Sequence, residues 1–229
     1  MPLPSAVPPE GAEPVIPRLP AGYLWLGSVA VVILTALIFF GIGWSSATPR
    51  PVSDTGADAG FARDMQEHHA QAVEMALLIR DKSSNEEIRA IAYDVATSQQ
   101  HQKGQMYAWL QDWGLSQARP IPPMAWMESE SGGHGSASPH AAQSGSGGAD
   151  GAMEGMATPE QMQALRRSSG AEADRLFTDL MIRHHQGGVA MASAGVRLAE
   201  TSTVRDFAAL VVDAQTAEIT ALQELRRSL

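Results

Sequence analysis

Residues 61–76 read FARDMQEHHAQAVEMA, and residues 177–192 read FTDLMIRHHQGGVAMA. The second stretch lies 116 residues after the first, and the two align without a gap. Seven identities, several of uncommon residue types and including two consecutive histidines, indicate an internal repeat. The paired residues are Phe61 and Phe177, Met65 and Met181, His68 and His184, His69 and His185, Val73 and Val189, Met75 and Met191, and Ala76 and Ala192. The same offset places Gln99 on Gln215, so the repeat extends into the segment that follows each stretch.

Apolar residues recur at helical spacing in the repeat and in the segments that follow it. Ser84 with Glu87 predicts a capping box at a helix start, and Gly114 predicts the end of that helix. Thr158 before Pro159 predicts the start of a shorter helix, which ends near residue 170. The four longer helices are expected over residues 61–80, 86–113, 171–200 and 204–229. We therefore predict an all-α fold, in which two pseudo-symmetric αα-hairpins form an up-and-down four-helix bundle over residues 55–229.

The N-terminal segments have a different composition. Residues 1–20 contain seven of the 14 prolines, which predicts a disordered Pro-rich tail. Residues 21–44 carry no formal charge and have Tyr23, Trp25 and Trp44 near their ends, as expected for a transmembrane helix. A signal peptide cleaved near residues 45–47 is the alternative. We expect a single-pass protein of the cell membrane with its C-terminal domain outside the cytoplasm.

Residues 115–157 are rich in Gly, Ser, Ala and Pro, so we expect a long flexible linker without a regular packed element. Its methionines and histidines either capture metal ions or are chance occupants of a tether. These residues are Met124, Met127, His134, His140, Met153 and Met156.

Composition excludes several classes of site. The chain has no cysteine, so disulfides, thiolate zinc sites, iron–sulfur clusters and cysteine nucleophiles are excluded. The formal net charge is −9 and basic residues form no stripe, which argues against nucleic-acid binding. There is no Glu-x-x-His pair of the kind that binds iron in helical bundles, and no nucleophile elbow or phosphate loop. We therefore expect binding rather than catalysis.

The repeated donors favour a metal ion. On a helical wheel, Met65, His68, His69 and Met75 fall within a sector about 120° wide, and Met65 lies within about one turn of both histidines. Met75 is about 10 Å along the axis from His68, so a complete site needs donors from another helix. The candidates in the first half are Gln99, His101 and Met106. In the second half, Ala217 and Leu222 stand at the positions that match His101 and Met106, and Glu218 lies nearby, so the two sites would not be equivalent. Thioether with imidazole, without thiolate, favours copper and especially Cu(I).

The pattern from Phe177 through Met181, His184 and His185 to Met191 resembles the signature of the ferritin-like domain of unknown function 305 family. The first half resembles the same signature again. The resemblance implies a ferritin-like helical bundle, usually exported or membrane-anchored in bacteria, with some members similar to periplasmic copper-binding proteins. The ligands that it implies are Met65, His68, His69 and Met75 in one half, and Met181, His184, His185 and Met191 in the other.

We therefore expect a membrane-anchored protein that binds copper outside the cytoplasm, for sequestration or delivery. Two alternatives stay open. In a non-metal interaction module, the same side chains would pack between helices or meet a protein partner. A copper-dependent redox enzyme would need an open coordination position and a substrate pocket.

Overall fold

The computed structural model describes residues 21–47, 51–131 and 153–229. The Pro-rich tail and most of the predicted linker, including His134 and His140, lie outside these ranges. The chain divides into two compact units, residues 1–50 and 51–229. The first unit contains helix α1, Ala21–Ala47, over the segment predicted to span a membrane. Within the described ranges, no helix combines the length and hydropathy needed to cross a membrane.

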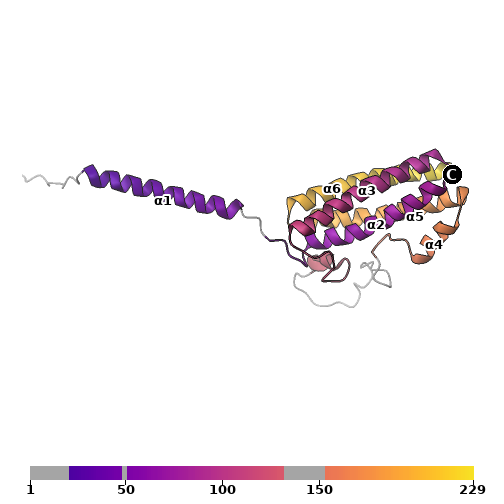
Figure 1. Ribbon diagram of the computed structural model, residues 1–229, viewed down its shortest axis with the longest axis horizontal. Helices are drawn as coiled ribbons and strands as arrows, with labels where there is room; N and C mark the ends of the chain where they lie inside the picture. The colour runs from indigo at the N-terminus through magenta and orange to yellow at the C-terminus, as the bar shows by residue number, and fades with distance from the viewer. Residues whose placement is uncertain (1–20, 48–50, 132–152) are drawn as a thin grey trace, which may run out of the picture. The chain divides into compact units, whose positions relative to one another are not determined.

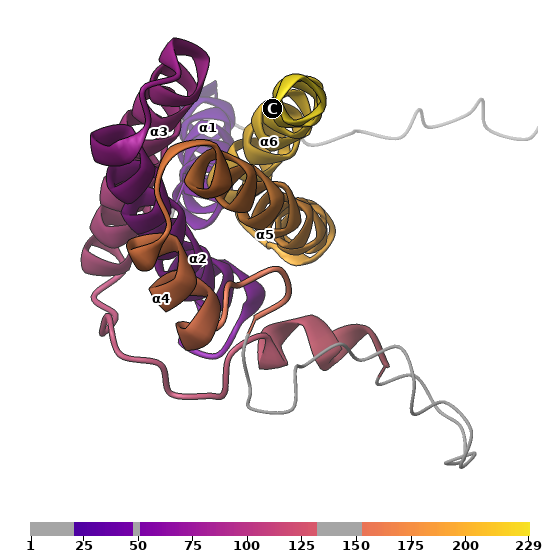
Figure 2. The same ribbon diagram turned by 90° about the vertical axis from the view of Figure 1, so that its right-hand side faces the viewer.

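The second unit is the predicted bundle of two helical hairpins (Figure 1). Helices α2 (Ala57–Lys82) and α3 (Glu86–Asp112) form the first hairpin, and α5 (Gly170–Leu198) and α6 (Ser202–Ser228) form the second. A view along the bundle shows α2 and α5 side by side between the outer helices (Figure 2), and these two helices make the main contact between the hairpins. The short helix α4 (Pro159–Arg167) packs on α2 and α5. The all-α prediction is confirmed.

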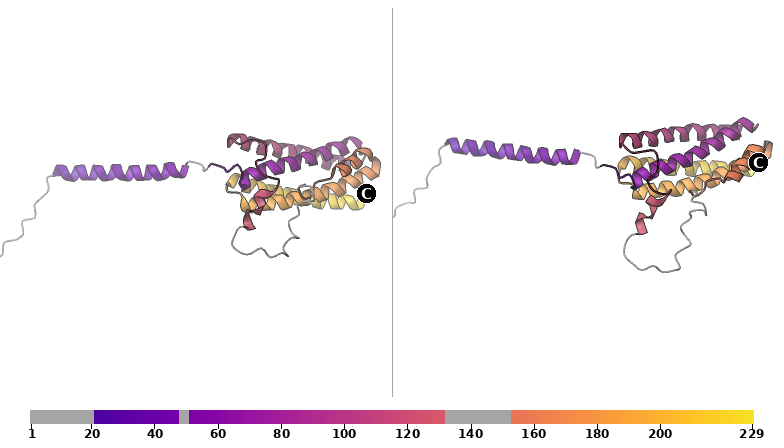
Figure 3. Two further views of the ribbon diagram at one scale, coloured as in Figure 1. Left: turned by 90° about the horizontal axis from the view of Figure 1, so that it is seen from below. Right: turned by 60° about the horizontal axis from the view of Figure 1, so that its bottom comes forward.

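The two inner helices run in opposite directions. Met65, near the start of α2, packs in the same apolar cluster as Met191, near the end of α5. Met75 packs in a second cluster with Met181. The repeat therefore folds into two hairpins related by an approximate two-fold axis, and the four long helices lie lengthwise along one another (Figure 3).

Local sequence signals account for most helix ends. The capping box of Thr158 with Gln161 forms as predicted. Gly114 adopts a left-handed backbone with φ of 69°, and the Leu115 amide donates to the Leu110 carbonyl at 2.8 Å, which closes α3. The start of α3 differs from the prediction by one residue. Asn85 is the N-cap instead of Ser84, because its side-chain oxygen accepts from the backbone of Glu87 at 2.9 Å.

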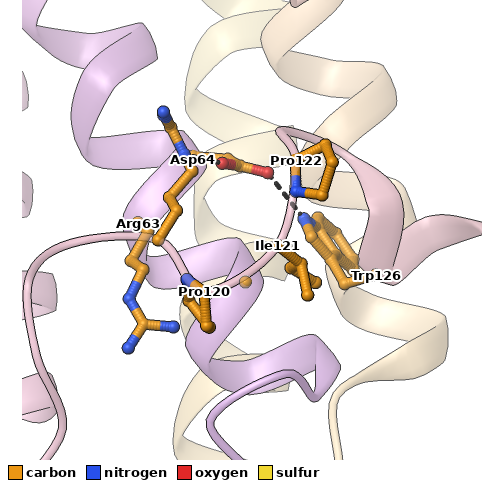
Figure 4. Close-up of a pocket in the computed structure, with 8 residues that line it drawn as sticks. Arg63, Asp64, Pro120, Ile121, Pro122 and Trp126 are labelled. Atoms are coloured by element: carbon orange, nitrogen blue, oxygen red, sulfur yellow. Dashed lines mark hydrogen bonds and ion pairs between the residues drawn. The ribbon is translucent and has the colours of Figure 1, made fainter.

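Part of the predicted linker is packed against the bundle, contrary to the expectation. Residues 125–131 form a 3₁₀ helix, η1 (Ala125–Ser131), in which Trp126 is only 2% exposed. The Asp64 carboxylate on α2 accepts from the Trp126 indole at 2.8 Å (Figure 4). It also accepts from the Met124 amide at 2.8 Å and pairs with Arg119 at 2.7 Å. A buried carboxylate and one large aromatic side chain therefore anchor a segment whose composition predicted only a tether.

Candidate metal centre

The repeated donors all lie inside the bundle. Helical periodicity directs them to the inner faces of α2 and α5, and every side chain in the set has an exposed fraction of 0%. The set consists of Met65, His68, His69, Met75, Met181, His184, His185 and Met191. Four fully buried histidines are unusual, because histidine prefers only partial burial and carries two polar ring nitrogens.

The structure brings donors of opposite hairpins together. The rings of His68 on α2 and His184 on α5 lie with their centroids 3.8 Å apart and their planes at 36°. The methionines that flank them also gather across the interface, since Met65 shares its cluster with Met191, and Met75 with Met181. The sequence predicted one site in each hairpin. The structure places His68 and His184 side by side, so candidate donors of the two hairpins meet where α2 packs on α5.

Three histidines use the same ring nitrogen for a hydrogen bond. His69 Nε2 donates to Gln102 Oε1 at 2.7 Å, and His185 Nε2 to Glu218 Oε2 at 2.6 Å. His68 Nε2 donates to the backbone carbonyl of Glu154 at 3.3 Å. In each case the partner atom is an acceptor, so Nε2 carries a proton, and Nδ1 is the nitrogen that a neutral ring could offer to an ion.

The remaining ring nitrogens are buried without partners. These are the Nδ1 atoms of His68, His69 and His185, and both nitrogens of His184. A buried polar atom left without a hydrogen bond costs about 1–3 kcal/mol. The centre therefore collects lone pairs that the protein itself does not satisfy, which fits a cation ligand set.

Burial also lowers the pKa of three of these imidazoles. Desolvation is the largest cause of a lowered pKa at His68, to about 4, and at His69, to about 3. The pKa of His184 is lowered well below its ordinary value by desolvation and by the neighbouring histidines. At neutral pH these rings are unprotonated, which is the form that binds metal ions.

The additional donors expected from the outer helices have different environments. Glu218 reaches His185, as described, whereas His101 and Ala217 are exposed. Met106 and Leu222 belong to the two apolar clusters. Gln99 and Gln215 are each 2% exposed, and neither amide has a hydrogen-bond partner, so these two equivalent side chains add polar atoms to the buried layer.

A segment at the end of the predicted linker covers the centre on one side. Residues 153–157, here called the strap, place the Glu154 carbonyl on His68, and the Ala157 backbone exchanges two hydrogen bonds with the Gln71 side chain, at 2.6 and 2.8 Å. The strap lies so close to α5 that a Cβ at Gly187 would stand 2.0 Å from the Glu154 oxygen. Gly155, with φ of 81°, makes the turn.

Sequence reasoning missed Gln102 and the strap. Gln102 and Glu218 are separated by the repeat offset of 116 residues, so the alignment contained a signal for this pair. The strap had no comparable signal, because its role depends on a backbone carbonyl. Across the described ranges, no group of three or more His, Asp or Glu side chains is arranged to hold a metal ion.

Comparisons with known proteins place the fold. A protein from Streptomyces coelicolor, described as secreted and as DUF305, is 37% identical, with a TM-score of 0.64 over 76% of this chain and 93% of that one. A DUF305 fragment from Deinococcus radiodurans is 28% identical, with a TM-score of 0.59 over 79% of this chain and 100% of that one. CopM in its Cu(I)-bound form has the same fold at 23% identity, with a TM-score of 0.53 over 75% of this chain and 96% of that one.

No curated protein matches the chain. The model of the domain of unknown function DUF305 matches residues 58–226, which is nearly the whole second unit. The chain therefore belongs to the DUF305 family.

Proposed function

We propose that this protein binds a soft metal ion, copper in the first place, between α2 and α5. The observation that carries the proposal is the set of buried, unpaired imidazole nitrogens around His68 and His184, flanked by fully buried methionines. An ion bound to these lone pairs would remove the free-energy cost of leaving them unsatisfied. The proposed ligands are drawn from the eight repeated Met and His residues.

The chemistry of the donors favours copper over other metals. Neutral imidazole and thioether together suit Cu(I), whereas magnesium, calcium and manganese prefer carboxylate and carbonyl oxygen. Zinc gains little from methionine. CopM has been solved with Cu(I), Cu(II) and Ag, so the same helical arrangement accommodates such ions in that protein.

Burial argues against contact of the histidines with a protein partner or a substrate. An interaction module that meets its partner through the histidines would present them at the surface, but all four have no exposed surface. Histidines that only pack between helices would leave their buried nitrogens unsatisfied, at a free-energy cost. A redox enzyme would need the ligands to meet a substrate, and the same burial leaves no ring surface for one. Storage or delivery of the ion is therefore the function that we favour.

We further propose that the domain works outside the cytoplasm, attached to a membrane by α1. Two observations support this: a relative from Streptomyces coelicolor is described as secreted, and α1 exposes a row of apolar side chains. Val32, Phe39 and Phe40 are each more than 60% exposed. An apolar surface of this kind is typical of a contact with lipid or protein. The test is fractionation of cells that express the full chain or a chain without residues 1–50; recovery of both in the same fraction would reject the attachment.

The metal proposal is tested by titrating the protein with Cu(I) against a competing chelator. We compare the wild type with a variant in which the histidines at positions 68, 69, 184 and 185 are replaced by glutamine. His101→Gln is the matched control, because His101 lies on α3 with its side chain exposed. The proposal expects tight binding by the wild type and the control, and its loss in the quadruple variant. Equal binding by all three proteins would refute it.

A further inference from the structure

Gln102 and Glu218 occupy equivalent positions in the two hairpins. They are 116 residues apart, Gln102 on α3 and Glu218 on α6. Each accepts a hydrogen bond from the second histidine of its own hairpin, His69 or His185, at nearly the same length, 2.7 and 2.6 Å. The two hairpins therefore have the same hydrogen bond at this position. The charge of the acceptor differs, because Gln102 is a neutral amide and Glu218 is a carboxylate.

The shared geometry has a consequence for the two rings. An acceptor on Nε2 requires a proton there, so Nδ1 is the nitrogen that a neutral ring has available for an ion. In both rings that Nδ1 is buried and has no hydrogen-bond partner among the described residues. The outer helices therefore determine which nitrogen of each ring is left available, although neither Gln102 nor Glu218 belongs to the proposed ligand set.

The difference in charge has a second consequence. A carboxylate that accepts from a metal-bound imidazole makes the ring a stronger donor and adds negative charge near the ion. Glu218 is 26% exposed, so it lies at the edge of the buried layer and its charge is only partly screened by water. An amide at the equivalent position gives the same orientation without the charge.

We propose that Gln102 and Glu218 are positioning residues that hold His69 and His185 with Nδ1 toward the ion, and that the carboxylate of Glu218 makes the second hairpin the half that favours a divalent ion. This inference rests on the proposed function. It assigns Cu(II) preference to His185, whereas the neutral amide that accepts from His69 suits Cu(I). The rival explanation is that both bonds only satisfy buried rings and have no influence on metal binding.

The first test needs no metal. We label the histidines of the full metal-free chain with ¹⁵N and determine by NMR which ring nitrogen of each carries the proton. The wild type is expected to have the proton on Nε2 of both His69 and His185. Glu218→Leu removes the acceptor and should mix the two proton positions at His185 alone, and Gln102→Leu should do so at His69 alone. A wild-type proton on Nδ1 of either ring would overturn the inference, whatever the protein binds.

The second test exchanges the charges. We measure Cu(I) and Cu(II) binding by chelator competition in the wild type, Glu218→Gln and Gln102→Glu. Loss of the carboxylate should weaken Cu(II) binding by about 10- to 100-fold and Cu(I) binding less, as expected for a group that contacts a ligand. Gln102→Glu should strengthen Cu(II) binding. Glu224→Gln, on the exposed face of α6, controls for net charge and should change neither affinity.

The two tests separate the two ideas. If the wild type binds no copper while the proton positions are as expected, the proposed function fails and the positioning of the rings stands. If copper binds but Glu218→Gln behaves like Glu224→Gln, the proposed function stands and the charge effect is refuted.

Discussion

Acidification is expected to destabilise the metal-free domain through its buried histidines. In the unfolded chain, His68 and His69 bind protons near their ordinary pKa of 6.5, whereas in the folded domain their pKa values are about 4 and about 3. Between pH 6.5 and 4 the unfolded state therefore holds more protons than the folded state. The free energy of unfolding must then fall as the pH falls, and it is fully retained only above pH 6.5.

The magnitude follows from the size of each pKa difference. One histidine contributes about 1.4 kcal/mol per pH unit, so the two together contribute about 2.7 kcal/mol per unit. For His68, the difference between 6.5 and about 4 corresponds to about 3.4 kcal/mol. Down to pH 4, His69 contributes a similar amount, and His184 acts in the same direction. Because domains are typically stable by about 5–15 kcal/mol, we expect unfolding on mild acidification.

Urea unfolding followed by circular dichroism at pH 7, 6, 5 and 4.5 measures this dependence. The matched variant carries His68→Gln and His69→Gln, so its carboxylates titrate as in the wild type while the two histidines are absent. The wild type should lose stability more steeply than the variant, by about 2.7 kcal/mol per pH unit below pH 6. Parallel curves for the two proteins would refute the argument that burial holds these rings neutral.

Two further substitutions test the parts of the linker that pack on the bundle. Gly187→Ala places a methyl group against the Glu154 carbonyl, so the strap must move. We expect Cu(I) to be released faster in stopped-flow chelator assays. We also expect the free energy of unfolding in urea to fall by about 1–3 kcal/mol. Gly104→Ala is its control, because no atom lies within 4 Å of a Cβ there, and unchanged release in both variants would contradict the role of the strap. Asp64→Ala removes the acceptor of three hydrogen bonds, including that of the Trp126 indole. It should lower the free energy of unfolding by about 3 kcal/mol or more and shift the tryptophan fluorescence. Retention of wild-type stability would show that this carboxylate does not anchor η1.

The sequence contained enough information for the hairpins but not for their docking. Periodicity and the 116-residue offset predicted four long helices and the shared face on which the paired methionines and histidines lie. They did not predict that His68 would meet His184, because spacing along one helix fixes which side chains share a face and not which helix covers that face. The expectation of one metal site in each hairpin stays a prediction.

The composition of the linker was the other source of error. A segment rich in Gly and Ser was expected to stay unpacked, yet the structure seats Trp126 in the bundle and places Gly155 against α5. The glycines of this segment predicted flexibility. At Gly155 and Gly187, however, the missing side chain allows the backbone of the strap to lie directly against the backbone of α5. Only a three-dimensional partner distinguishes these two uses of the same residue.

The antiparallel arrangement of α2 and α5 also bears on how such a protein could arise. Each hairpin supplies one imidazole of the central pair and one sulfur of each methionine pair, so a single hairpin holds half of every pair. Two identical copies of one hairpin, meeting face to face about a two-fold axis, would restore the complete arrangement, since such an interface uses the same surface on both partners. A self-associating ancestor of half this size could therefore have had this arrangement before duplication and fusion joined its two copies. Differences between the halves, such as the amide of Gln102 and the carboxylate of Glu218, became possible only after that fusion.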